Sequence, residues 1–188
     1  VNRRVLARDF GEGQAAANRP LFLHQLVAEI LPQLPDVDAR LREGVEVAEF
    51  GCGEGWASIG LALGYPDSVI DGVDIDEPSI VAARRHAAAH GVSDRVTFSD
   101  AGTAALGRGY DAVFAFECIH DLPDPVAALA ELRRIAKLGA AVVVMDERTQ
   151  AEATGKLLWN DFTDRYSAAS ADAGPVYRNA RLQRTMFV

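Results

Sequence analysis

The chain has 188 residues and a formal net charge of −8, with 27 acidic side chains against 19 Lys and Arg. Apolar residues make up 49% and charged residues 24%, a composition typical of one globular domain and not of a disordered chain. The acidic balance disfavours nucleic-acid binding, because phosphate contacts need clustered Lys and Arg. The longest apolar run, Ala140–Met145, is far shorter than the ~18 residues of a membrane span. We therefore expect a cytoplasmic protein without a membrane partner.

A helical preface precedes the first predicted strand, so we divide the chain into a preface, residues 1–44, and a domain, residues 45–188. Apolar side chains at helical spacing predict a helix over Pro20–Gln33, and Pro35 follows its end. The chain starts with Val1 rather than Met. We therefore expect it to be a segment of a longer protein.

Five apolar segments predict β-strands, with room for helices between them. The strands are expected over Val45–Phe50, Val69–Ile75, Val96–Phe98, Tyr110–Phe116 and Ala140–Met145. The helices are expected over Trp56–Leu63, Pro78–His90 and Leu122–Leu138, the last with Gly139 as its C-terminal stop. This alternation predicts an α/β fold: a doubly wound, Rossmann-like, mostly parallel sheet with helices on both faces.

The segment after Met145 is short. It contains a predicted helix over Gln150–Tyr166, and only Val176–Tyr177 and Arg181–Val188 are candidates for further strands. Too few residues separate these two candidates for a helix to lie between them. We therefore expect the C-terminal strands of the sheet to be abbreviated.

Three glycines at alternate positions follow the first strand, in the run Glu49-Phe50-Gly51-Cys52-Gly53-Glu54-Gly55-Trp56. A glycine turn lets the backbone approach a ligand closely, and the helix start behind it aims amide N–H groups at that ligand. A dinucleotide-binding G-x-G-x-x-G fingerprint would need its third glycine at position 56, which is Trp56 here. The spacing therefore disfavours a nicotinamide or flavin cofactor.

An acid ends the second predicted strand. Asp74 follows Gly53 by 21 residues, a spacing at which a carboxylate can accept hydrogen bonds from two ribose hydroxyls. Asp76 and Glu77 are rivals for this role, although helix capping suits them better. The glycine turn and the acid together predict a ligand that contains a nucleoside.

These motifs resemble those of the class I S-adenosylmethionine-dependent methyltransferase family. The resemblance rests on Glu49–Gly55, Gly72–Asp76, Arg95–Ala101, Tyr110–Glu117 and Ile119–Pro125. It spans residues 45–146 and implies S-adenosylmethionine as the cofactor. The run Phe10–Gly13 is similar to a bacterial subgroup whose members often carry a winged-helix segment ahead of this domain.

The resemblance also implies roles for single residues. Glu49 would face the methionine ammonium of the cofactor, directly or through water. Asp74 would bind the ribose, and Asp100 would accept from the adenine amino group. The other residues that the resemblance places around the cofactor are Gly51, Cys52, Gly53, Ile75, Ala101, Phe116 and Glu117.

His120 is the candidate general base, because it follows the fourth strand at the sheet edge where ligands bind. A base is needed only when the methyl acceptor must lose a proton, and the alternative is a loop histidine bonded to nearby backbone.

Cys52 and Cys118 follow strands that are neighbours in the family, so both thiols are expected at one cleft. His86 and His90 are four residues apart and could bind a metal on one helix face, but no third ligand is apparent. The sequence therefore predicts no metal site.

The predicted activity is methyl transfer to an oxygen, nitrogen or carbon atom of a small molecule. Glu117–His120 replaces the Asn/Asp-Pro-Pro-Tyr/Phe motif of families that methylate nucleobase or glutamine amide nitrogen. Two alternatives stay open: a regulatory or sensor module that binds S-adenosylmethionine without turnover, and an enzyme of this fold that uses an altered cofactor. The sequence identifies neither the acceptor nor the oligomeric state, and it leaves a homodimer open.

Overall fold

The computed structural model describes residues 13–100, 106–107, 109–147, 176–179 and 184–187. Its strands are β1 (Glu46–Phe50), β2 (Val69–Val73), β3 (Val96–Ser99), β4 (Tyr110–Phe116), β5 (Ala136–Glu147), β6 (Val176–Asn179) and β7 (Arg184–Phe187). All five predicted parallel strands are present, and both C-terminal candidates form strands of four residues. The helix predicted over Gln150–Tyr166 lies outside the described residues.

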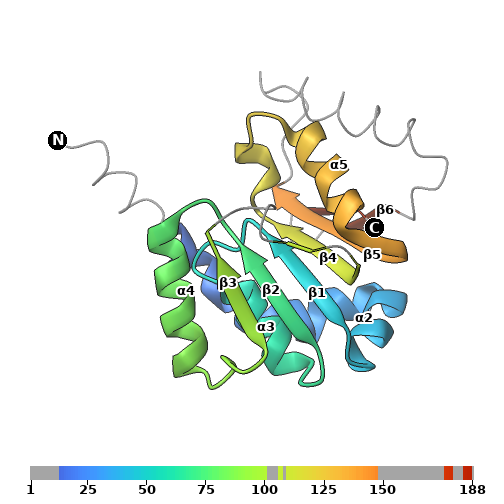
Figure 1. Cartoon of the computed structure of the whole chain (residues 1–188). Helices are drawn as coiled ribbons and strands as arrows, with labels where there is room; N and C mark the ends of the chain where they lie inside the picture. The colour runs from blue at the N-terminus through green and yellow to red at the C-terminus, as the bar shows by residue number, and fades with distance from the viewer. Residues whose placement is uncertain (1–12, 101–105, 108, 148–175, 180–183, 188) are drawn as a thin grey trace.

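The strands form one seven-stranded sheet in the order β3-β2-β1-β4-β5-β7-β6 (Figure 1). Strands β1 to β5 are parallel to one another, and β7 pairs antiparallel with both β5 and β6. The strand order reverses direction between β1 and β4, which is where ligands bind in open parallel sheets. The predicted doubly wound α/β fold is confirmed.

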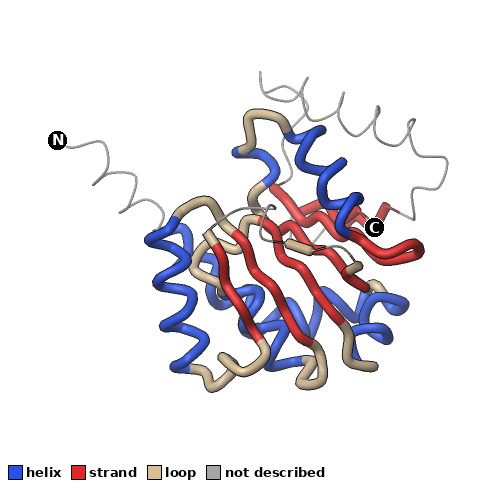
Figure 2. Tube along the Cα trace, viewed as in Figure 1, coloured by secondary structure: helices blue, strands red, loops and turns tan. Residues whose placement is uncertain are grey.

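Helices cover both faces of the sheet (Figure 2). The π-helical segment η1 (Leu21–Ile30) and helices α2 (Pro35–Arg42), α3 (Trp56–Gly64) and α4 (Glu77–Ala89) share one core cluster with inward side chains of the strands. Helix α5 (Pro125–Ile135) packs on the opposite face of β4 and β5. Within the described part of the chain, no helix is long and apolar enough to cross a bilayer.

The helices before β1 belong to the same hydrophobic core as the sheet. Leu26 and Leu31 are fully buried in the cluster that also contains strand residues such as Ile70. The chain is helical from residue 13, and the helix predicted over Pro20–Gln33 is present as η1 and a short 3-10 turn. These helices therefore pack directly against one face of the sheet.

Helix α2 was missed by the sequence prediction, because a proline after a helix usually signals its end. Pro35 is instead the first residue of α2, a position where the missing N–H group has no intrahelical partner to lose. Asp36 and Asp38 lie in the first turn, where the helix dipole favours negative charge.

Helix α3 packs on η1 through two glycines. A Cβ atom added at Gly60 would clash with the carbonyl oxygen of Phe22, and one added at Gly64 would clash with the side chain of Val27. The absence of side chains at these positions lets the two helices approach closely. This contact fixes the position of Phe22, which lines the cavity described below.

Gly60→Ala should lower the free energy of unfolding by about 1–3 kcal/mol, the typical cost of overpacking. The clashing atom belongs to the backbone, so it cannot rotate away as a side chain would. Urea unfolding measures the change. Gly13→Ala is the matched control, because its added Cβ atom meets nothing within 4 Å. A free energy of unfolding equal to that of the wild type in Gly60→Ala would contradict the close packing of α3 on η1.

The predicted bounds of α5 and the predicted start of β5 are wrong. The helix expected over Leu122–Leu138 begins at Pro125 and ends at Ile135, and β5 begins at Ala136 rather than Ala140. Gly139 does not stop the helix; its φ of +77° fits the irregular start of β5, where the register with β4 shifts.

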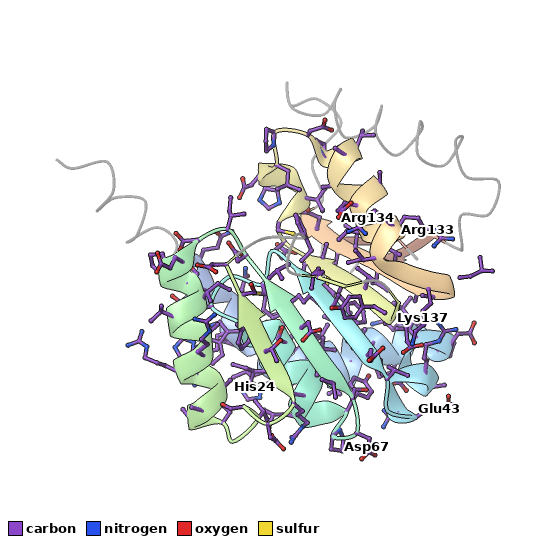
Figure 3. The ribbon with its side chains drawn as sticks, viewed as in Figure 1. His24, Glu43, Asp67, Arg133, Arg134 and Lys137 are labelled. Atoms are coloured by element: carbon purple, nitrogen blue, oxygen red, sulfur yellow. The ribbon has the colours of Figure 1, made fainter. Side chains whose placement is uncertain are left out.

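Tertiary hydrogen bonds explain the early start of β5. Arg40 Nη1 donates to the carbonyl oxygens of Asp111 and Gly139, at 3.0 and 2.9 Å. Lys137 Nζ donates to the Asp111 carboxylate at 2.8 Å, and Figure 3 labels Lys137 at this end of the sheet. These contacts hold the start of β5 against β4 and override the helical preference of the sequence.

Candidate functional site

A cavity of about 370 Å³ lies at the carboxyl ends of β1, β2 and β4. The glycine turn after β1, the loop after β2 and the residues after β4 form its walls, together with the N-terminal helix. The predicted site residues on these walls are Gly51, Cys52, Gly53, Asp74, Ile75, Phe116 and Glu117. The structure thus brings most of the predicted cofactor residues to one cavity.

The glycine turn has backbone conformations that favour glycine. The φ angles of Gly51 and Gly53 are +69° and +50°. The N–H groups of Gly51 and Cys52 both donate to the carbonyl oxygen of Val73, at 2.9 and 3.0 Å, which attaches the turn to the end of β2. A Cβ atom at Gly53 would meet nothing within 4 Å, so the backbone there is open to the cavity.

Asp74 braces the same turn. One carboxylate oxygen accepts the Gly53 N–H at 2.8 Å, and the other accepts the Asp76 N–H at 2.9 Å. Each oxygen retains a second lone pair for a ligand hydroxyl. Asp76 caps α4 by accepting the Ser79 N–H at 3.0 Å. Asp74 is therefore the acid that combines a fixed orientation with a place on the cavity wall.

Carboxylates dominate the charge of the cavity wall. Glu54, Asp74, Glu117 and Asp121 line it, and among the described lining residues there is no Lys or Arg. Glu117 has a φ of +54°, unusual for a residue with a side chain, and its N–H donates to the Met145 carbonyl oxygen at 2.8 Å. Such a wall favours a cationic ligand.

Glu49 lies behind the glycine turn. It is not among the described residues that line the cavity. Its side chain is almost fully buried and accepts a hydrogen bond from the Ser58 hydroxyl. Burial raises the pKa of Glu49 to about 8, against the opposing effect of the Ser58 bond. The carboxyl group is therefore mostly protonated at neutral pH, and its contact with the methionine ammonium stays a prediction.

The two residues predicted to contact adenine, Asp100 and Ala101, are not among the described residues that line the cavity. Asp100 follows β3 and is exposed, outside the wall that the described residues form. Ala101 lies outside the described residues. Both roles stay predictions.

His120 lies in a 3-10 turn, η4 (Ile119–Asp121), directly after β4. Its Nδ1 lies 2.5 Å from Oδ1 of Asp146, and its backbone N–H donates to Oδ2 of the same carboxylate at 3.1 Å. Asp146 is fully buried near the end of β5. The sequence prediction missed this partner; the available signal was an acid directly after the apolar run Ala140–Met145, on the strand beside β4.

The N-terminal helix, residues 13–20, supplies a cavity wall that the sequence did not predict. Gln14 and Asn18 line the cavity from this helix. The guanidinium carbon of Arg19 lies 4.5 Å from the ring centre of Trp56, which stacks on His86 with 4.1 Å between ring centres. This cation–π contact holds the helix beside the glycine turn.

Both cysteines line the cavity, as the neighbouring strands predicted. Burial raises the pKa of the Cys52 and Cys118 thiols well above the usual value, and nearby carboxylates raise it further. Neutral thiols are weak nucleophiles and weak metal ligands. Within the described residues, no group of three His, Cys, Asp or Glu side chains could hold a metal ion.

Comparison with known proteins identifies the family. A family model described as "Methyltransferase domain" matches residues 41–178. The 27-O-demethylrifamycin SV methyltransferase of Amycolatopsis mediterranei is 29% identical over 109 residues, which cover 56% of this chain and 40% of that protein. The ubiquinone biosynthesis O-methyltransferase of Hahella chejuensis is 33% identical over 100 residues, which cover 52% of this chain and 41% of that protein.

A solved structure supports the fold. Magnesium protoporphyrin IX methyltransferase from Synechocystis PCC 6803, solved with bound SAM, matches with a TM-score of 0.63 at 20% identity, over 87% of this chain and 76% of that one. The matched regions span 40% and 41% of the two curated relatives, whereas the family model covers most of the present chain. The chain therefore belongs to the methyltransferase domain family that its sequence motifs predicted.

Proposed function

We propose that this domain binds S-adenosylmethionine and assists transfer of its methyl group to a hydroxyl oxygen of a small molecule. The observation that carries the proposal is the Asp74 carboxylate, fixed by two backbone N–H groups on the wall of an anionic cavity. The names of the two curated relatives described above specify oxygen, as do those of two further ubiquinone biosynthesis O-methyltransferases, whereas one relative, ajmaline N-methyltransferase, has a name that specifies nitrogen. The balance favours oxygen as the acceptor atom.

The residues of the cavity fit the parts of this cofactor. Asp74 would accept from the ribose hydroxyls, and Ile75, 86% exposed beside it, offers apolar surface to adenine. Glu117 would face the cationic end, and its unusual backbone conformation is of the kind often found at functional sites. When bound, S-adenosylmethionine supplies a methyl group on a sulfonium cation.

The chain contributes orientation and a proton acceptor. The glycine turn and Asp74 fix one reactant, and the N-terminal helix with Phe22 closes the cavity around it. Holding two reactants in line accounts for much of the acceleration of a displacement reaction. His120, next in the chain to the lining residue Asp121, would accept the proton of the acceptor hydroxyl.

Calorimetry with S-adenosylmethionine and S-adenosylhomocysteine tests the cofactor, and a methyl-transfer screen of phenols, alcohols, amines and carboxylates tests the reaction. We expect both ligands to bind and a phenol or alcohol to be methylated. Binding without turnover across the panel would favour the regulatory module instead. A folded chain that binds neither ligand would overturn the proposal.

A further inference from the structure

We infer that Phe22, Phe116 and Asp121 form the acceptor subsite of the cavity, and that this subsite selects an aromatic acceptor with an ammonium group beside its reacting hydroxyl. The inference rests on the proposed methyl transfer to oxygen, and it narrows the acceptor to one chemical class. The two phenyl rings contact the ring of the acceptor, and the Asp121 carboxylate contacts its ammonium group.

Two phenyl rings line the cavity from distant parts of the chain. Phe22 lies in η1 and Phe116 ends β4, and their ring centres are 5.9 Å apart, with the rings tilted by 37°. Both side chains also belong to the core, at 8% and 4% exposure. Aromatic rings bind other rings in offset or edge-on arrangements at such distances. The wall therefore favours a flat aromatic acceptor over an aliphatic one.

Both rings are held in place from behind. Phe114 is fully buried and stacks on Phe116, with 5.1 Å between ring centres. The carbonyl oxygen of Phe22 lies in the space that a Cβ atom on Gly60 would occupy, so α3 fixes the backbone that carries this ring. A wall that is rigid before the ligand arrives has little conformational freedom to lose on binding.

Asp121 is the lining carboxylate that the cofactor leaves unused. In the proposed function Asp74 accepts from the ribose, and Glu117 faces the cationic end of the cofactor. Glu54 has its Oε2 atom 3.9 Å from Nδ1 of His86, on α4. Asp121 instead lies in η4, directly after β4, and the described residues of the wall include no Lys or Arg to neutralise it. A cationic group on the acceptor supplies that charge.

The position of Asp121 sets where the ammonium group lies in the acceptor. Its Oδ2 is 3.5 Å from Nε2 of His120, the candidate base, and 72% of its side chain is exposed. A hydroxyl that reaches Nε2 and an ammonium group that reaches Oδ2 must therefore lie close together. In an ortho-aminomethyl phenol the oxygen and nitrogen can approach to about 3 Å, the length of an ordinary hydrogen bond. The geometry thus matches an amine beside the hydroxyl and not an amine across the ring.

The same contact directs the methyl group to oxygen. An ammonium group held by a carboxylate keeps its protons and has no lone pair, so its nitrogen is not a nucleophile. The hydroxyl proton passes to Nε2 of His120 while the oxygen bonds to the methyl carbon. The electron pair of the broken carbon–sulfur bond stays on sulfur, and His120 later releases the proton to solvent.

The wild type and Asp121→Asn are compared on 2-(aminomethyl)phenol and 4-(aminomethyl)phenol, which carry the same groups. We expect the ortho-to-para ratio of kcat/KM to fall about fivefold in the variant, the upper end for an exposed ion pair. Each phenol has the same intrinsic reactivity with both proteins, so the change in the ratio isolates Asp121. An unchanged ratio, or a product methylated on nitrogen, would overturn the inference.

Asp124→Asn is the matched control. It removes a carboxylate from the same loop, where Asp124 caps α5 by accepting the Ala127 N–H, and asparagine caps helices equally well. Asp124 is not among the described residues that line the cavity. This variant should keep the ortho-to-para ratio of the wild type. A fall equal to that in Asp121→Asn would mean that general negative charge sets the preference, against the inference.

Calorimetry of the chain saturated with S-adenosylhomocysteine needs no turnover. In the wild type 2-methoxybenzylamine should bind about fivefold more tightly than 4-methoxybenzylamine, and Asp121→Asn should abolish the difference. The cyclohexyl counterpart, (2-methoxycyclohexyl)methanamine, should bind the wild type about 3- to 10-fold more weakly, because it lacks the ring contacts with Phe22 and Phe116. Equal binding of the two isomers, or of the aromatic and cyclohexyl amines, would contradict the subsite. If these amines bind as expected but no acceptor is methylated, the proposed function fails and the subsite stands.

Discussion

Asp74→Asn should weaken the binding of S-adenosylmethionine and S-adenosylhomocysteine about 10- to 100-fold. Hydrogen bonds to a charged group contribute about 1.5–3 kcal/mol, and each 1.4 kcal/mol is about a tenfold change in affinity. The asparagine also has only one acceptor oxygen for the N–H groups of Gly53 and Asp76, so one of the two backbone hydrogen bonds that orient this side chain is lost. Calorimetry with both ligands measures the loss.

Asp76→Asn is the control for charge. It removes a carboxylate two residues away and keeps the cap of α4, because asparagine also accepts the Ser79 N–H. Affinity for both ligands should change less than threefold, about 0.6 kcal/mol. Similar losses in the two variants would mean that general negative charge, and not the ribose contact of Asp74, determines affinity.

Much of the fold follows from local sequence. The continuous apolar run of β4 predicts a strand covered on both faces, and Tyr110–Phe116 has the bounds expected of it. The helix expected from Leu122 begins three residues later, at Pro125, where Asp124 caps it and the proline fits its first position. Each of these features depends on neighbours within one or two turns of chain.

The parts that were missed depend on distant contacts. The start of β5 is fixed by Arg40, whose bond to the Gly139 carbonyl oxygen joins residues 99 positions apart. No helix-stop rule includes that arginine, so Gly139 was predicted to end a helix. The close packing of η1 on Gly60 likewise depends on a partner that local periodicity does not reveal.

The candidate site divides in the same way. The glycine turn and Asp74 belong to one strand–helix–strand unit, so their spacing in the sequence predicts their contact. Asp146 meets His120 only because β5 lies beside β4 in the sheet, which joins residues 26 positions apart. Gln14 and Asn18 reach the cavity through packing of the N-terminal helix, for which the sequence carries no motif.

Glu49→Gln should remove a pH dependence from the folding stability. Burial raises the pKa of Glu49 from 4.5 to about 8. Between these values the folded chain retains a proton that the unfolded chain has released, so stability falls as the pH rises. The stabilisation is fully present below about pH 4.5 and is lost as the pH rises through about 8.

The expected size of the effect is large. At up to about 1.4 kcal/mol per pH unit, the free energy of unfolding should fall by on the order of 4 kcal/mol between about pH 5 and pH 8 from this carboxyl group alone. Glutamine cannot ionise, and its carbonyl oxygen can still accept from the Ser58 hydroxyl. The variant should therefore be more stable than the wild type at pH 8.

Urea unfolding at several pH values, followed by circular dichroism, measures the difference. Glu43→Gln is the matched control, because Glu43 is exposed at the end of α2 and Figure 3 shows it at the surface. It should keep the pH profile of the wild type. Parallel profiles for the wild type and Glu49→Gln would contradict the raised pKa, whereas a flatter profile in Glu49→Gln alone would locate the buried proton behind the glycine turn.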